Sequence, residues 1–273
     1  MLKKQIIIFI FISQLIIDFV YSQENQYFDE QQFFKQMQTS YYALTETNIN
    51  NFTVLLTNIR TEKFAQDKWN NNEIFPIQMI WLASDRIFLS EQGVPALDDS
   101  AKKIYSELVG DLKKQVSGVL FDLKRFYLNG VFKSISNDYQ LRQINDLIEI
   151  KFTQMNQEDS TYFTYYFGLN GLCLKIVTET PSLNQKVETY PYFKIIKTKW
   201  ILTGWEVQMS INNKIETGFV VTLKNRLHNE LWIPLEMSIT VQQSKTPGQT
   251  FNDSIKFRNF LYNQPLQYIE QPK

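Results

Sequence analysis

Two side chains of this sequence could act together as a nucleophile and a base, and they are Cys173 and His228. Each is the only residue of its type among the 273 residues. An imidazole beside a thiol or hydroxyl activates the nucleophile of many hydrolases. His228 lies within residues 226–229, which read as a turn between strands, whereas Cys173 lies in a different predicted hairpin. A hydrolase that uses His228 is therefore one hypothesis, and a solvated turn histidine is the simpler interpretation.

Spacings typical of metal and cofactor sites are missing from the sequence. One histidine and one cysteine cannot supply the usual ligands of a zinc site, and no Cys-x-x-Cys or His-x-Glu spacing occurs. Gly168 and Gly171 are not followed by a helical pattern, so they do not indicate a phosphate-binding loop. Glu206 and Glu236 fall on polar faces of predicted strands, where carboxylates are usually exposed. The sequence therefore predicts a non-catalytic protein without a cofactor or a metal.

Composition is typical of a globular protein that does not rely on charged partners. The chain has 28 basic and 28 acidic residues, without a long run of either sign. This balance argues against nucleic acid as a partner. The 21 Phe and 14 Tyr residues can build a large core. A single cysteine cannot form an internal disulfide, so Cys173, between two leucines, is predicted to be buried.

Residues 1–22 have the pattern of a secretory signal peptide. Lys3 and Lys4 precede an apolar run over residues 6–17, and Ser22 is a small residue suited to cleavage. The apolar run is shorter than the roughly 20 residues that span a bilayer. We therefore expect a single mature domain over residues 23–273, located outside the cell or in the secretory lumen. The sequons at Asn51 and Asn252 fit glycosylation in that compartment.

Alternating apolar residues between 190 and 243 predict three consecutive strands of one curved antiparallel sheet. Over residues 231–241, six apolar side chains alternate with more polar ones, so one face of that strand must be dry. The apolar faces of the three strands carry Trp205, Val207, Phe219, Val221, Leu223, Leu235, Met237 and Ile239. Further strands are predicted over residues 52–64, 77–82, 86–89, 148–152, 161–167, 172–177 and 255–262. Asn170 and Gly171 predict a two-residue hairpin turn in which both residues have positive φ.

Two segments have the period of an amphipathic helix, namely residues 28–44 and residues 101–127. Counted from its cap near Asp98, the second helix has about thirty residues and a length of about 45 Å. Lys124 and Arg125 suit its last turn, where cations interact favourably with the helix dipole. Gly110 and Gly118 weaken it by about 1 kcal/mol each, so a kink or a division is expected there. Its apolar stripe includes Leu112, Val116 and Leu120.

These elements together predict an α+β fold. We expect a strongly curved antiparallel sheet of about eight to ten strands, forming a half-open barrel. The N-terminal helix and the long helix should cover its concave face.

The order of these parts resembles the LolA/LolB-type lipoprotein carriers and their lipid-binding relatives. The resemblance rests on residues 80–89, on the strand with Trp232, Ile233 and Pro234, and on residues 255–266. It implies a half-open barrel whose concave apolar face holds acyl chains beneath helical lids.

We therefore predict a secreted, non-catalytic binder or carrier of a lipid or another apolar small molecule. The groove would be formed by the eight strand residues together with Leu112, Val116 and Leu120. The acceptor of the ligand could be a membrane or another protein, and the sequence does not decide between them. The alternative is a secreted structural or surface-interaction protein whose helices seal the core, and the hydrolase is a further alternative. An open pocket between helix and sheet favours the carrier, and a filled interior favours the structural protein.

Overall fold

The computed structural model of the protein describes residues 28–156, 159–243 and 250–265. The chain divides into two units, residues 1–36 and residues 37–273. The predicted signal peptide lies outside the described residues. Helix α2 (Glu30–Ser40) is shorter than the predicted helix over residues 28–44. It ends early because Tyr41 forms a β-bridge with Trp200 and Leu44–Glu46 forms a 3-10 turn.

The second unit is built on one open antiparallel sheet, which has twelve strands within the described residues. This confirms the predicted antiparallel sheet with a few helices, although the sheet has more strands than expected. The strand order is β3-β2-β1-β12-β11-β10-β9-β8-β7-β6-β5-β4. The strands are β1 (Asn51–Asn58), β2 (Ile77–Leu82), β3 (Arg86–Glu91), β4 (Tyr139–Ile144), β5 (Leu147–Asn156), β6 (Asp159–Gly168), β7 (Cys173–Thr180), β8 (Gln185–Ile196), β9 (Lys199–Ile211), β10 (Lys214–His228), β11 (Leu231–Gln243) and β12 (Thr250–Tyr262).

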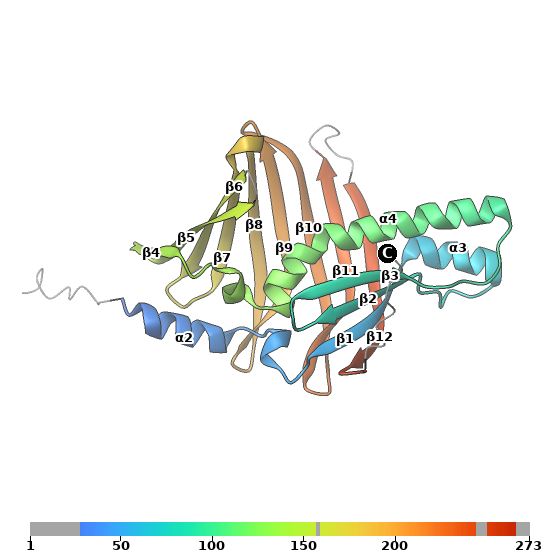
Figure 1. Cartoon of the computed structure of the whole chain (residues 1–273), viewed down its shortest axis with the longest axis horizontal. Coiled ribbons are helices and arrows are strands. Elements are labelled where there is room, and N and C mark those ends of the chain that lie inside the picture. Colours follow the sequence, from blue (N-terminus) through green and yellow to red (C-terminus); the bar gives the residue numbers. More distant parts are fainter. Residues whose placement is uncertain (1–27, 157–158, 244–249, 266–273) are drawn as a thin grey trace, which may run out of the picture. The chain divides into compact units, whose positions relative to one another are not determined.

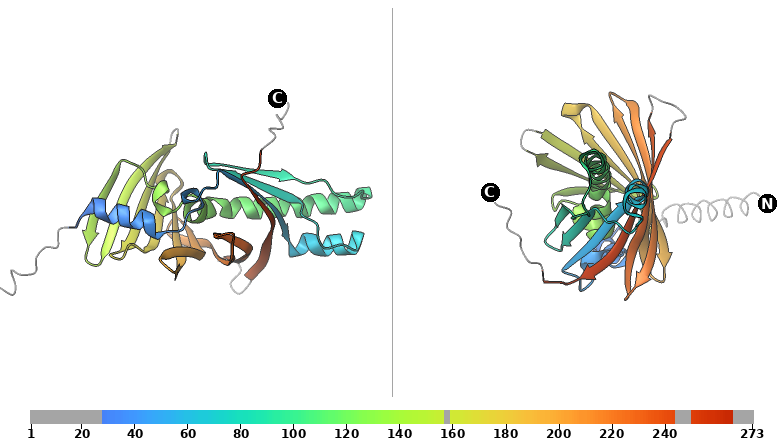
Figure 2. Two further views of the ribbon diagram at one scale, coloured as in Figure 1. Left: turned by 90° about the horizontal axis from the view of Figure 1, so that it is seen from below. Right: turned by 90° about the vertical axis from the view of Figure 1, so that its right-hand side faces the viewer.

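The strand order explains why the chain contains a long helix. β3 and β4 follow each other in the sequence but lie at opposite edges of the sheet. The segment between them contains α4 (Asp99–Leu123), which runs across the strands in Figure 1. In the view along this helix in Figure 2, the strands curve around it. With 25 residues, α4 spans about 37 Å, enough to pass several strands.

The long helix is confirmed, and the division expected at its glycines does not occur. α4 is continuous through Gly110 and Gly118, and the Asp98 side chain caps its start by accepting a hydrogen bond from the Ala101 N–H at 2.8 Å. A methyl group on either glycine would meet no other atom within 4 Å, so neither serves close packing. The buried stripe of the helix consists of Ala101, Tyr105, Val109, Leu112, Val116, Val119 and Leu123. A π-helical turn, η2 (Lys124–Leu128), follows it.

The strand predicted over residues 52–64 is half strand and half helix. β1 ends at Asn58, whose side chain accepts a hydrogen bond from the Thr61 N–H at 3.0 Å. The Thr61 hydroxyl in turn accepts one from the Asn58 N–H at 3.1 Å. This reciprocal capping box starts α3 (Ile59–Trp69). α3 lies beside the N-terminal half of α4 (Figures 1 and 2), where Phe64 and Trp69 contact the ring of Tyr105.

Bulges interrupt the alternation that the sequence pattern predicts. Leu235 is the extra residue where Pro234 and Glu236 pair with consecutive residues of β10, and it is only half-buried. Thr203 is extra in the same way between β8 and β9. An extra residue bends its strand and increases the local twist. The predicted dry face of residues 231–241 is therefore broken at Leu235, and both Ile233 and Pro234 are buried.

Two turns also differ from their predictions. The hairpin between β6 and β7 has a four-residue connection, residues 169–172, in which the Gly171 N–H donates to the Gly168 carbonyl at 2.8 Å. Gly171 has φ 79°, whereas Asn170 is not among the residues with positive φ. The turn expected over residues 225–230 is shorter, because β10 continues to His228. Asn229 and Glu230, with φ 47° and 66°, form it.

Candidate functional site

The predicted groove residues lie in the sheet and in α4, and most of them are packed. Eight of the eleven are buried, and these are Trp205, Val207, Val221, Leu223, Met237, Ile239, Leu112 and Val116. Phe219, Leu235 and Leu120 are half-buried. The ring of Trp205 contacts that of Phe126, just beyond α4, at 6.5 Å between centroids. Side chains therefore fill most of the space that the sequence pattern assigned to a ligand.

A smaller cavity of about 160 Å³ is left between α4 and the strands β10, β11 and β12. Its lining is largely apolar and consists of Gly118, Val119, Phe219, Ile239, Val241 and Phe251, with Gln115 and Asp253 on its polar side. Phe251 is 48% exposed and Gly118 is exposed, so the cavity opens to solvent beside these residues. Of the predicted groove residues, Phe219 and Ile239 line it. The arrangement can hold a small apolar group.

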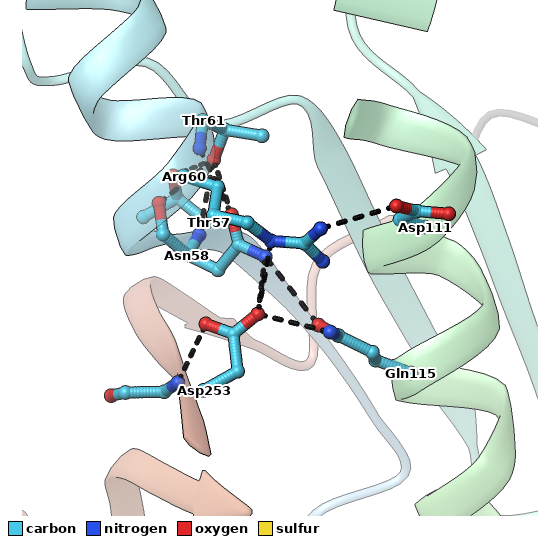
Figure 3. Close-up of polar contacts among 8 residues, drawn as sticks. Thr57, Asn58, Arg60, Thr61, Asp111, Gln115 and Asp253 are labelled. Atoms are coloured by element: carbon cyan, nitrogen blue, oxygen red, sulfur yellow. Dashed lines mark hydrogen bonds and ion pairs between the residues drawn. The ribbon is translucent and has the colours of Figure 1, made fainter. Parts of the chain in front are cut away.

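The buried carboxylate of Asp253 forms the polar side of this cavity. Figure 3 shows its polar contacts. The Asp253 side chain is 2% exposed, and its Oδ2 accepts hydrogen bonds from Gln115 Nε2 at 2.9 Å and Asn58 Nδ2 at 3.2 Å. The Arg60 Nε lies 3.3 Å from the same oxygen, and Arg60 Nη1 also lies 3.1 Å from Asp111 Oδ2. These contacts tie α3, α4 and β12 together. They fix the position of α4 where the cavity opens.

The alternating pattern of β12 could have predicted two of the residues that line the cavity. Ile255 and Phe257 alternate along β12 and are buried. Continuing that period of two backwards reaches Asp253 and Phe251, which lie before the strand predicted over residues 255–262. Gln115 had no such signal, because its role depends on α4 lying against β12.

The structure does not bring Cys173 and His228 together. Cys173 lies on β7 and His228 at the end of β10, and β8 and β9 separate these strands in the sheet. Cys173 is buried as predicted, whereas His228 is exposed, with its Nε2 3.4 Å from Asn229 Nδ2. In the part of the chain that the structure describes, no three or more His, Cys, Asp or Glu residues gather as metal ligands would.

The Cys173 thiol should be unreactive in the folded protein. Burial raises its pKa to about 12, so it is protonated at neutral pH, and the thiolate is the reactive form. We expect a disulfide reagent in mildly alkaline buffer to label Cys173 only as fast as the protein unfolds. In denaturant the same reagent should titrate the thiol at once. Fast labelling of the native protein would show that this part of the core opens locally.

The two sequons differ in accessibility. Asn252 is exposed on β12, whereas Asn51 is half-buried at the start of β1. The Asn51 Oδ1 atom is buried and has no hydrogen-bond partner among the described residues. Asn252 is therefore the more accessible acceptor for a glycan.

Two further observations concern membrane-spanning helices and similarity to known proteins. Within residues 28–156, 159–243 and 250–265, no helix is long and apolar enough to cross a membrane. The resemblance to LolA/LolB-type carriers stays a prediction. Comparison with protein-family models, with curated proteins and with solved structures finds no match to this chain.

Proposed function

We propose that the protein is a secreted, non-catalytic binder of an apolar ligand, which inserts one group between α4 and the strands β10–β12. The observation that carries this proposal is the apolar cavity that opens beside Gly118 and Phe251. Its volume of about 160 Å³ is close to that of a dry engineered cavity of about 150 Å³ that binds benzene. A benzene-sized group or the end of an acyl chain fits, whereas a whole lipid does not.

In this function the curved sheet acts as a half-open barrel, and α4 is its fixed inner wall. The open strand order and the passage of α4 across several strands support this view. The continuous helix, its buried stripe and the Asp253 contacts all favour a helix that stays in place. The ligand would therefore enter beside Gly118, and α4 would not need to lift away as a lid.

Substituting Gly118 by leucine tests the site, and Gly110 provides a matched control. Both glycines lie on α4 and have free space around an added Cβ, but Gly118 lines the cavity and Gly110 does not. Both variants should fold with equal or higher stability, because leucine favours a helix over glycine by up to about 1 kcal/mol. We expect N-phenyl-1-naphthylamine to bind saturably to the wild type and to Gly110→Leu. Gly118→Leu should lose this binding.

Two outcomes of this fluorescence titration would count against the proposal. Equal binding by Gly118→Leu would place the probe elsewhere on the protein. No saturable binding by the folded wild type would remove the apolar-ligand function altogether.

The second candidate is a secreted structural or surface-interaction protein. The burial of eight of the eleven predicted groove residues favours it, because a filled interior leaves little room for a ligand. This function would take the place of the first if the wild type binds no apolar probe.

A further inference from the structure

A second pocket, of about 490 Å³, lies at the C-terminal end of α4 and shares no lining residue with the apolar cavity. Three cations, Lys124, Arg125 and Lys133, line it together with one acid, Asp85. Aromatic rings, including those of Phe121 and Phe163, form part of its wall. This combination of positive charge and apolar surface differs from the first cavity and calls for a different ligand.

Arg125 is the unusual residue of this pocket, because its positive charge is buried and only weakly balanced by a nearby negative charge. The sequence pattern predicts it as a helix-end cation, yet its side chain is only 3% exposed. Its Nε is buried and has no hydrogen-bond partner among the described residues. The nearest acid is Asp122, whose Oδ1 lies 3.6 Å from Nη1, too far for a hydrogen bond. Burying a charge without full pairing is costly, so an acceptor at this position would be strongly favoured.

Neighbouring groups hold the guanidinium in place. It lies over the ring of Phe121, with 4.3 Å from Cζ to the ring centroid. The π-helical turn contains both Lys124 and Arg125, and its Asn129 N–H donates to the Lys124 carbonyl at 2.9 Å. Such turns are rare and often occur at functional sites. Burial raises the pKa of the Asp122 carboxyl, although Arg125 opposes that shift.

The other polar groups of the pocket differ in whether they already form ion pairs or hydrogen bonds within the protein. Lys124 Nζ lies 2.7 Å from Asp85 Oδ2, so this cation is paired. Lys133 Nζ is 3.9 Å from Glu46 Oε1, and both of these side chains are more than half exposed. The Ser136 hydroxyl accepts a hydrogen bond from the Asp138 N–H at 3.3 Å and keeps its own O–H to donate. Lys133 and Ser136 are thus able to contact an incoming anion.

We infer that this pocket binds the oxyanion group of a small organic molecule, such as a phosphate ester, with Arg125 at its base and Lys133 and Ser136 at its rim. A guanidinium donates parallel hydrogen bonds to two oxygens of one phosphate group. The volume of the pocket and its aromatic wall leave room for an apolar part beside the anion. The inference rests on side chains outside the apolar cavity, so it does not depend on the function proposed above.

Calorimetric titration at low ionic strength tests the inference with three probes. Phenyl phosphate should bind most tightly, inorganic phosphate more weakly, and benzyl alcohol should not bind, because it lacks the anion. Equal affinities for the two phosphates would identify free phosphate as the ligand and would still support an oxyanion site. Absence of saturable binding by both phosphates would overturn the inference.

Three variants locate the site. Arg125→Lys should weaken phenyl phosphate binding by about tenfold or more, because one hydrogen bond to a charged group is lost. Lys133→Gln should weaken it several-fold, and since Lys133 is exposed this variant should fold even if the buried one does not. Lys113→Gln is the control, because Lys113 lies on α4 outside the pocket and pairs weakly with Glu91 at 3.5 Å. Unchanged affinity in Lys133→Gln, with binding retained in the wild type, would place the anion elsewhere.

Discussion

Replacement of Gly171 by alanine is expected to lower the free energy of unfolding by about 2–5 kcal/mol. An added Cβ would lie 1.2 Å from Met37 Sδ, and Met37 is buried, so its whole side chain must move. Overpacking of this kind costs about 1–3 kcal/mol. Gly171 also has φ 79°, and the left-handed region costs a residue with a Cβ a further 1–2 kcal/mol or so. The total is a large part of a typical domain stability of about 5–15 kcal/mol.

A change at Gly171 should also disturb Tyr41, because the Tyr41 hydroxyl is hydrogen-bonded to this loop. The Tyr41 hydroxyl donates to the Gly171 carbonyl at 2.7 Å and accepts a hydrogen bond from the Cys173 N–H at 2.7 Å. Chemical denaturation should show the loss, with Gly110→Ala as a control that gains about 1 kcal/mol. Met37→Ala should cost less in the Gly171→Ala background than in the wild type, because the side chain it removes is the one that clashes. If Gly171→Ala were as stable as the wild type, the described packing of Met37 on this loop would be wrong.

Replacement of Asp253 by alanine is the second change expected to have a large effect. It removes the acceptor that Gln115, Asn58 and Arg60 share. Breaking a buried ion pair costs about 3–5 kcal/mol, but Arg60 is 32% exposed and water can compensate it in part. We therefore expect a loss of about 3 kcal/mol.

Asp111→Ala is the matched control for this substitution. Asp111 contacts the same arginine but is 50% exposed, and exposed pairs contribute about 0–1 kcal/mol. Urea denaturation of the two variants should separate them clearly. Equal losses would mean that the interaction with Arg60, rather than the buried carboxylate, stabilises the junction of α3, α4 and β12.

Local patterns predicted the elements of this fold better than their irregularities. The apolar stripe and the Asp98 cap place α4, and period two correctly places Trp205, Val221 and Met237 in the interior. The same pattern fails at Leu235, because a bulge shifts the register without changing the type of residue. β4 was missed because an edge strand buries little and therefore has a weak pattern. The region predicted to hold three strands holds four, because β8 precedes them and was not predicted as a strand of its own.

The candidate sites were harder to predict, because they depend on contacts between distant segments. Gln115 and Asp253 are 138 residues apart and meet only because α4 lies over β12. Arg125 has the sequence context of an exposed helix-end cation, and its burial follows from the π-helical turn and the surrounding rings. Sequence spacing alone contains neither the crossing of the helix nor the geometry of that turn.

The pairing of β1 with β12 sets the order in which this protein can fold during synthesis. β1, β2 and β3 leave the ribosome early, but β12, the strand that joins them to the rest of the sheet, comes from residues 250–262. Until then the edge of β1 and the apolar stripe of α4 lack their final partners. Pairings over such long sequence separations are slow, and exposed edges favour aggregation. The sheet should therefore be completed only once β12 has been synthesised, and until then the edge of β1 stays exposed to unwanted pairing.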